Sequence, residues 1–210
     1  IERELYAENP VFVCSKTDRS NAPVRGTCSN LMNLWPVYPE FLQDAFQRAF
    51  GEGLKDCNKR LSEAEWRKVL YRLLDEGVTC PRCKEINFAS MNKDGIIGCT
   101  VNSCRKTYPV PFKAVVNGFE IYVDSGKVLT DYHVTYGNRD TVIGTFVESK
   151  KNPGVYGLKN DSTTIWNVEY PGKEPMTYEG GKVVTVIPDT VITIGNKKVV
   201  IEKAEIQAQA

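Results

Sequence analysis

Two pairs of cysteines near the middle of the chain are the residues whose type and spacing most clearly indicate chemistry. Cys80 and Cys83 bracket a C-P-R-C motif, and Cys99 and Cys104 form a second close pair with four residues between them. The intervening stretch Asn92-Lys93-Asp94-Gly95 is a hairpin signal that would return the second pair to the first. Two short turns of this kind can place four thiolates tetrahedrally around Zn²⁺. We therefore predict a structural zinc ribbon with these ligands: Cys80, Cys83, Cys99 and Cys104.

Two disulfide bonds, or four reduced surface thiols, are the alternatives to a metal site. The remaining cysteines, Cys14, Cys28 and Cys57, have no informative neighbours and are interpreted as ordinary thiols. An odd total of seven cysteines favours a reducing compartment over a disulfide framework. Because four cysteine ligands fill a tetrahedral zinc ion, the metal would hold the fold and would leave no open position for catalysis.

Composition and charge limit the classes of partner. The chain has 210 residues, of which 41% are hydrophobic and 25% charged, and its formal net charge is +1. This balance gives no general case for a nucleic-acid or membrane partner. No apolar run of about 18 residues exists, so we expect no transmembrane helix. The chain shows neither an initiator Met nor a signal-peptide pattern, and we expect a cytoplasmic piece of a longer protein.

The chain before the cysteine pairs has the pattern of helices. From Phe41 to Phe50, apolar residues recur at three- and four-residue spacing and form one apolar face. Gly51 and Gly53 are expected to end this helix. Residues 1–38, in contrast, indicate irregular chain that lies over a surface.

A second helix is predicted directly before the ribbon. Ser62 begins it, Glu65 completes a capping box three residues later, and Gly77 closes it. Its apolar stripe consists of Trp66, Val69, Leu70, Leu73 and Leu74. Two helices alone cannot bury stripes of this width, so we expect residues 39–77 to self-associate or to pack against another surface.

After Phe112 the apolar pattern changes to the two-residue period of β-strands. Asn117-Gly118 separates two such runs and is the strongest short hairpin signal in the chain. Further short runs, each bounded by turn residues, cover residues 142–147, 165–168, 183–187, 191–194 and 199–201. Many short strands with regular turns predict an antiparallel β-sandwich.

These patterns predict an α+β multi-domain protein with four parts. A helical segment covers residues 1–78, and the four-cysteine zinc ribbon covers residues 79–111. The antiparallel β-sandwich covers residues 112–204, and a flexible tail covers residues 205–210.

Residues 41–50 and 56–66 resemble the last two helices of a protein-kinase C-lobe and the turn between them. In that family the turn reads D-P-x-x-R-P-[ST]-x-x-E-[WL], and here Cys57 and Leu61 replace the two prolines. The resemblance implies a structural role for Arg60, which in the family pairs with a buried glutamate that is not in this chain. No glycine-rich loop, β3 lysine in context, H-R-D or D-F-G motif is present, so we expect no catalysis by this chain.

The order of parts resembles the C-terminal region of bacterial eukaryotic-like serine/threonine kinases, in which a ribbon and a forkhead-associated-like β-sandwich follow the kinase lobe. Such a sandwich binds phosphothreonine through Gly-Arg, Ser-Arg-x-His and Asn-Gly motifs on its loops. Residues 114–210 contain no Gly-Arg, and Thr130-Asp131-Tyr132-His133 echoes the second motif with an anion in place of a cation. His133, the single histidine, is interpreted as a structural or surface group. The remaining candidate phosphate contacts are Asn138, Arg139, Lys159 and Asn160.

The resemblance therefore implies a regulatory and interaction region of such a kinase. Its sandwich would recruit a protein partner, a substrate or the kinase domain of the same protein. The alternative is a nucleic-acid-binding protein that uses the ribbon, because residues 80–113 carry six basic and two acidic side chains. Its contacts would be Arg82, Lys84, Lys93, Arg105 and Lys106, with Phe88 and Tyr108 stacking on bases.

Overall fold

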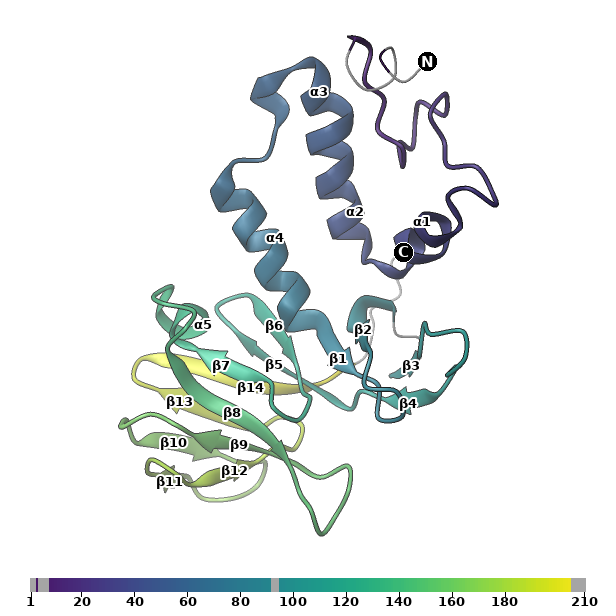
Figure 1. The fold of residues 1–210 in the computed structure, drawn as a ribbon. Helices are drawn as coiled ribbons and strands as arrows, with labels where there is room; N and C mark the ends of the chain where they lie inside the picture. The colour runs from purple at the N-terminus through teal and green to yellow at the C-terminus, as the bar shows by residue number, and fades with distance from the viewer. Residues whose placement is uncertain (1–2, 4–7, 92–94, 205–210) are drawn as a thin grey trace. The chain divides into compact units, whose positions relative to one another are not determined.

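The chain divides into two compact units, Ile1–Leu74 and Asp75–Ala210 (Figure 1). The structure is a computed structural model that describes residue 3, residues 8–91 and residues 95–204. The predicted tail and residues 92–94 of the predicted hairpin signal lie outside the described residues. The architecture is α+β, with a short helical part and several antiparallel sheets, as predicted. The predicted ribbon and sandwich both belong to the second unit.

Helices make up the regular structure of the first unit. The α-helices are α1 (Ser29–Leu34), α2 (Glu40–Gln47), α3 (Gly53–Lys55) and α4 (Glu63–Glu76). Short 3-10 turns lie at Trp35–Val37 and Cys57–Lys59, and a π-helical turn at Arg48–Glu52 joins α2 to α3. The last two residues of α4 already belong to the second unit. α1 lies within the stretch for which the sequence predicts irregular chain.

Gly51 and Gly53 do not end the first helical stretch, which corrects the prediction. The π-helical turn carries the chain through Gly51 and on into α3. At Gly53 small size matters more than conformational freedom, because a Cβ there would lie 2.8 Å from Cγ of Arg60. The Nε of Arg60 also donates to the Gly53 carbonyl at 2.7 Å. Arg60 therefore connects the end of this helical stretch to the turn before α4.

The predicted capping box at the start of α4 is confirmed. The backbone N–H of Glu65 donates to Oγ of Ser62 at 3.3 Å, and the N–H of Ser62 donates to Oε2 of Glu65 at 2.7 Å. The guanidinium of Arg48 lies 2.7 Å from Oε1 of Glu65. The Ser62 N–H and the Arg48 guanidinium lower the pKa of Glu65 to about 2. Because that pKa is depressed in the folded state, the contribution of Glu65 to stability is complete above its ordinary pKa and is lost as the pH falls toward 2.

Aromatic side chains cluster in the first unit. Five rings contact one another: Phe12, Trp35, Phe46, Phe50 and Trp66. The rings of Phe46 and Trp66 lie 5.3 Å apart in an edge-to-face arrangement, and Phe12 covers Phe46 from the N-terminal segment. The first 38 residues thus supply part of the surface that the two helical stripes need. Leu70 and Leu74, in contrast, are 48% and 60% exposed.

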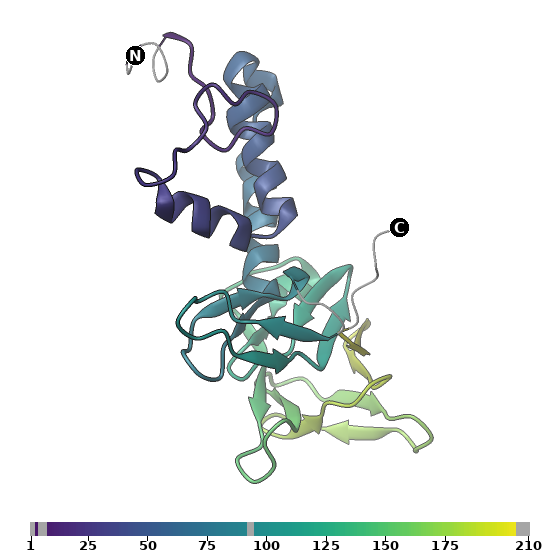
Figure 2. The ribbon, with the colours of Figure 1, turned by 90° about the vertical axis from the view of Figure 1, so that its right-hand side faces the viewer.

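Two small hairpins open the second unit (Figure 2). β1 (Gly77–Thr79) pairs with β2 (Ile86–Phe88), and β3 (Ile96–Gly98) pairs with β4 (Thr107–Pro109), both antiparallel. Gly77 ends α4 and begins β1, as the sequence predicts. Their shared buried cluster includes Val78, Ile97 and Val110, and it continues onto Tyr122 and Ala204 from the chain beyond them.

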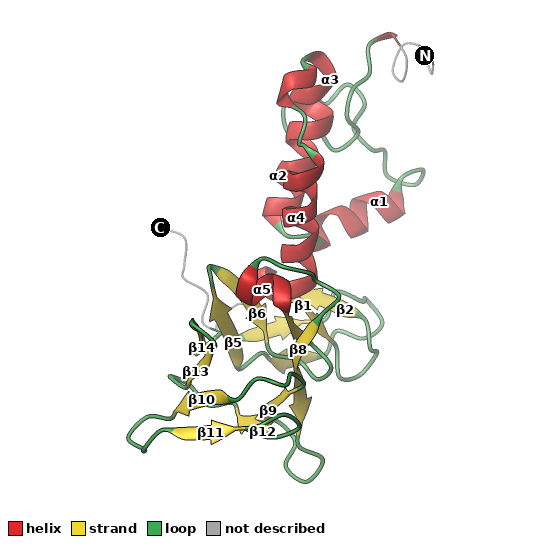
Figure 3. Ribbon diagram, turned by 90° about the vertical axis from the view of Figure 1, so that its left-hand side faces the viewer, coloured by secondary structure: helices red, strands yellow, loops and turns green. Residues whose placement is uncertain are grey.

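The rest of the second unit consists of two antiparallel sheets (Figure 3). In the described residues the larger sheet has the strand order β11-β10-β13-β14-β5-β6, and the smaller has β12-β9-β8-β7. The strands of the first are β5 (Phe112–Val116), β6 (Phe119–Tyr122), β10 (Trp166–Glu169), β11 (Met176–Tyr178), β13 (Val191–Ile194) and β14 (Lys197–Lys203). Those of the second are β7 (Val128–Thr130), β8 (Val142–Glu148), β9 (Tyr156–Asn160) and β12 (Val183–Thr185). A short helix, α5 (Asp131–Thr135), joins β7 to β8.

The two sheets share one hydrophobic core. Phe146 and Leu158 from the smaller sheet are fully buried in the same cluster as Ile121, Trp166 and Ile192 from the larger one. The predicted Asn117-Gly118 hairpin joins β5 to β6, and both residues have positive φ, 49° and 82°. This is the backbone that a two-residue turn between twisted strands requires.

Replacing Ser62 with Ala should destabilise the first unit by about 1 kcal/mol, because the N–H of Glu65 loses its acceptor at the start of α4. Urea unfolding followed by tryptophan fluorescence would measure the change. Ser62→Thr, which keeps a capping hydroxyl, is the matched control and should lose much less. Equal stability of Ser62→Ala and the parent chain would contradict the capping role.

Candidate metal centre

The four cysteines of the two predicted pairs meet in the second unit. Their sulfur atoms all lie within 4.8 Å of one another. The Sγ atoms of Cys80 and Cys104 are 3.8 Å apart, and those of Cys83 and Cys99 are 3.5 Å apart. Each of these contacts joins a residue of the first pair to a residue of the second. Among the described residues, this is the group of cysteine, histidine and acidic side chains close enough to hold a metal ion.

Each cysteine pair sits in a tight turn at the end of a hairpin. In the first turn the N–H of Cys80 donates to the Glu85 carbonyl at 2.8 Å, and in the second the N–H of Cys99 donates to the Lys106 carbonyl at 2.8 Å. Lys84 and Arg105 follow the second cysteine of each pair and have positive φ values of 64° and 46°. That backbone region favours glycine. The backbone of each turn is therefore locally strained, at Lys84 and at Arg105, in the conformation that brings the sulfurs together.

Backbone N–H groups also point at the sulfurs. Burial disfavours the Cys80 thiolate, but the N–H groups of Cys83 and Arg82 donate to its sulfur and lower its pKa to about 6. At Cys83 the N–H of Glu85 favours the thiolate, whereas burial and the neighbouring sulfurs raise its pKa to about 12. Burial raises the pKa of Cys99 as well.

The donor set and its geometry fit a tetrahedral zinc ion. A tetrahedron with Zn–S bonds of about 2.3 Å has sulfur–sulfur edges of about 3.8 Å, close to the two separations above. The cysteines among the described residues are free thiols in the structure. Four thiolates would supply the charge that a divalent cation needs, and the cation would permit all four to ionise. Thiolates are soft ligands, and among the metal ions that accept four of them this donor set favours zinc.

The chain that leads into the metal centre is bound by polar groups of the sheets that follow. The N–H of Thr79 donates to Oδ2 of Asp124 at 2.8 Å. The ammonium of Lys127 donates to the carbonyl of Gly77. Burial lowers the pKa of Lys127 to about 8, and nearby Arg139 adds to this effect, while the carboxylates of Asp75 and Asp124 oppose it. β1 is thus held at both ends by the loop between β6 and β7.

The basic residues of the predicted ribbon are exposed, but its aromatic residues are not. Arg82, Lys84, Arg105 and Lys106 are solvent-exposed, whereas Lys93 lies outside the described residues. Phe88 and Tyr108 are only 9% and 8% exposed and pack within the second unit. The two rings are therefore not available to stack on bases, contrary to what nucleic-acid binding would require of them.

The candidate phosphate contacts lie at one end of the smaller sheet. Register pairs Gly144 of β8 with Asn160 of β9, so the turn before β8 and the end of β9 are neighbours. Asn160 is fully buried, its amide donates to the Thr164 and Tyr178 carbonyls, and its Oδ1 accepts from Ser162.

The other three candidates differ in accessibility. Lys159 is exposed, and its ammonium lies 2.5 Å from the carboxylate of Asp161. Oδ1 of Asn138 accepts the N–H of Asp140 at 2.9 Å. Arg139 lies 2.5 Å from Asp75. The phosphate role of the four residues remains a prediction, and in this structure Asn160 and Arg139 are occupied by internal contacts.

A buried polar cluster around His133 is the feature that sequence reasoning did not assemble. His133 is fully buried, so it is a structural rather than a surface group. The N–H of Thr130 donates to its Nδ1 at 3.0 Å, which assigns the ring proton to Nε2. That nitrogen lies 3.3 Å from both carboxylate oxygens of Asp75. Nη1 of Arg139 lies 3.0 Å from the same nitrogen. Asp75 comes from α4, His133 from α5 and Arg139 from the turn before β8, and no local pattern in the sequence links them.

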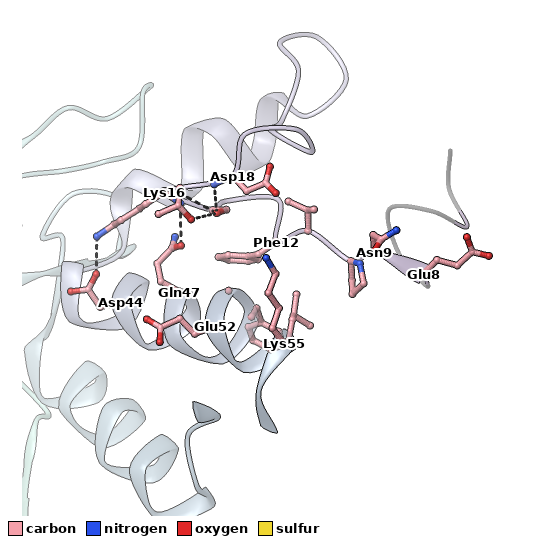
Figure 4. A pocket seen from close by; sticks show the side chains of 16 residues that line it. Glu8, Asn9, Phe12, Lys16, Asp18, Asp44, Gln47, Glu52 and Lys55 are labelled. Atoms are coloured by element: carbon pink, nitrogen blue, oxygen red, sulfur yellow. Dashed lines mark hydrogen bonds and ion pairs between the residues drawn. The ribbon is translucent and has the colours of Figure 1, made fainter. Parts of the chain in front are cut away.

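A hollow of about 730 Å³ opens in the first unit, between the N-terminal segment and the stretch from α2 to α3 (Figure 4). Figure 4 shows Lys16 reaching toward Asp44 and Gln47 pointing toward the N-terminal segment. The ammonium of Lys16 lies 2.7 Å from Oδ1 of Asp44, and the amide of Gln47 donates to the Cys14 carbonyl at 2.6 Å. None of the predicted metal or phosphate-contact residues lines this hollow.

No protein-family model, no curated protein and no solved structure matches this chain. In the described part of the chain, no helix combines the length and the apolar character needed to cross a bilayer.

Replacing Cys99 with Ser should remove most of the bound metal, because a site with three thiolates holds zinc much less tightly. Metal analysis of reduced, purified protein should find one zinc ion per chain in the parent. Cys57→Ser, at an exposed thiol outside the cluster, is the matched control and should keep its zinc. We also expect a lower melting temperature for Cys99→Ser, since the ribbon cluster includes Tyr122 and Ala204. Full zinc content in Cys99→Ser would contradict the assignment.

Proposed function

We propose that this chain is a non-catalytic regulatory and interaction region of a bacterial serine/threonine protein kinase. In this proposal a structural zinc ribbon braces a degenerate forkhead-associated-like β-sandwich, and the sandwich recruits a protein partner or the kinase domain of the same protein. The observation that carries the proposal is the closed four-cysteine cluster, which packs in one compact unit with the two-sheet core.

A closed cluster supports a structural role for the metal. When bound, the ion would cross-link the two hairpins through Cys80, Cys83, Cys99 and Cys104 and would have no free position for substrate or water. Two residues near the cluster also hold the first hairpin in place, because Asp124 and Lys127 bind the backbone of β1. A rigid cross-link of this kind is suited to a domain that holds a binding surface in a fixed position.

The resemblance to the kinase tail supports the regulatory context. Helices α2 and α4, the Arg60 contact with Gly53 and the capping box of Ser62 are compatible with the end of a C-lobe. The sequence lacks the glycine-rich loop, H-R-D and D-F-G, so phosphoryl transfer would be the task of another part of the protein.

The basic ribbon favours nucleic-acid binding as the second candidate, and charge compensation weakens it. A divalent ion on four thiolates leaves a net charge of about −2 at the centre. The exposed cations around it offset this charge: Arg82, Lys84, Arg105 and Lys106. With Phe88 and Tyr108 buried, those cations would have to bind phosphates without base stacking.

Reading the coding sequence upstream of Ile1 tests the proposal directly. We expect an in-frame glycine-rich loop, a β3 lysine, H-R-D and D-F-G, together with the glutamate that pairs with Arg60 in the family. A start codon at or immediately before Ile1 would contradict the kinase context.

The salt dependence of nucleic-acid binding separates the two candidates. If four ribbon cations contacted phosphates, the logarithm of the affinity for single-stranded DNA would fall against the logarithm of the salt concentration with a slope of about −3. We expect fluorescence anisotropy to show no such binding. A steep slope that Lys84→Ala and Arg105→Ala each reduce would favour the nucleic-acid role.

A further inference from the structure

The carboxylate of Asp75 occupies a pocket lined with cationic and hydrogen-bonding groups of the β-sandwich. Its side chain is only 3% exposed. Nη2 of Arg139 donates to Oδ1 of Asp75 at 2.5 Å, and Nε2 of His133 lies 3.3 Å from each carboxylate oxygen. Lys127 is close enough for its ammonium to interact electrostatically with the same carboxylate. The anion therefore faces two side chains within hydrogen-bonding distance and a third cation nearby, whose ammonium donates to the Gly77 carbonyl.

His133 and Arg139 come from the connection between β7 and β8, whereas Lys127 lies at the opposite end of β7. Lys127 precedes β7, His133 lies in α5, and Arg139 lies in the turn before β8. The orientation of His133 is fixed by the N–H of Thr130, and Nη1 of Arg139 lies 3.0 Å from its Nε2. The Arg139 side chain is 15% exposed, so one side of the pocket reaches solvent. The site is preorganised by the sandwich, whereas its anion is supplied by α4.

The position of Asp75 on α4 is unfavourable for a helix. It is the second-last residue of α4, whose last turn contains no basic residue. An acidic side chain at a helix C-terminus opposes the helix dipole, and its burial adds a desolvation cost. The helix gains nothing from this carboxylate by itself, so its stabilisation comes from the Arg139 and His133 side chains.

We propose that Arg139, His133 and Lys127 form an oxyanion-binding site of the β-sandwich that Asp75 occupies in cis, and that an acidic or phosphorylated side chain of a protein partner competes for it. By occupying the site, Asp75 then blocks it intramolecularly. Because Asp75 is tethered to the same chain, its effective concentration at the site is high, and a free ligand must displace it. The inference concerns this chain's own site and stands whether or not the parent protein is a kinase.

Chemical rescue tests the proposal on the full chain. Asp75→Gly removes the carboxylate and leaves space beside Arg139 for a small anion. We expect acetate or phosphate to raise the melting temperature of this variant by about 3–6 °C at about ten times the dissociation constant, relative to chloride at equal ionic strength. A larger effect of phosphate would identify a phosphorylated side chain as the better ligand, and a larger effect of acetate an acidic one.

Two controls make the outcome specific. Asp140→Gly removes an exposed carboxylate next to Arg139 without opening a buried space, and it should show no rescue. The double variant Asp75→Gly/Arg139→Met should lose the rescue because it lacks the main donor. The absence of any anion effect on Asp75→Gly, or an equal effect on Asp140→Gly, would overturn the proposal.

A conservative variant decides the question if Asp75→Gly does not fold. Asp75→Asn keeps the shape of the side chain and removes its charge, so phosphate should displace it more easily. Proton NMR of the single His133 ring should shift with phosphate at least tenfold lower in concentration than in the parent chain. A His133 signal that responds identically in both proteins would also overturn the proposal.

Discussion

The convergence of four sulfur atoms on one point organises the start of the second unit. β1 to β4 have three residues each, and two such hairpins bury too little apolar surface to hold themselves together. The sulfurs of Cys80, Cys83, Cys99 and Cys104 lie close enough to hold a metal ion, and a shared cation would supply the missing cross-link between both turns. The strained backbone at Lys84 and Arg105 is compatible with this dominant constraint.

Polar contacts bind the same segment from its other side. Within the stretch from Asp75 to Thr79, a carboxylate is held by Arg139, a carbonyl by Lys127 and an N–H by Asp124. The three bound groups lie where α4 passes into β1. The loop between β6 and β7 and the turn before β8 therefore bind both the end of the helix and the start of the chain that leads to the cysteines. A buried ion pair adds little net stability, but removing one partner is costly, which makes such contacts good determinants of a single arrangement.

Two of the candidate phosphate contacts beside the smaller sheet make internal contacts in the structure. Arg139 forms an ion pair with the buried carboxylate of Asp75. The side chain of Asn160 forms hydrogen bonds with the backbone of the loop that follows β9. A phosphate-binding arginine must be desolvated and fixed in place, and an internal anion satisfies the same physical requirement. The degenerate motifs in the sequence and the occupied arginine in the structure are consistent with each other on this point.

The sequence by itself determined what depends on neighbours along the chain. Three such local features are found in the structure: the capping box at Ser62, the Asn117-Gly118 turn and the close approach of the two cysteine pairs. Tertiary structure decided what depends on distant contacts. Gly53 is small because Arg60 passes over it, and the helix continues where glycine alone predicts its end. The contacts around Asp75 join residues 58 and 64 positions apart, and only the packed fold buries its carboxylate among them, so that the loss of one partner becomes costly.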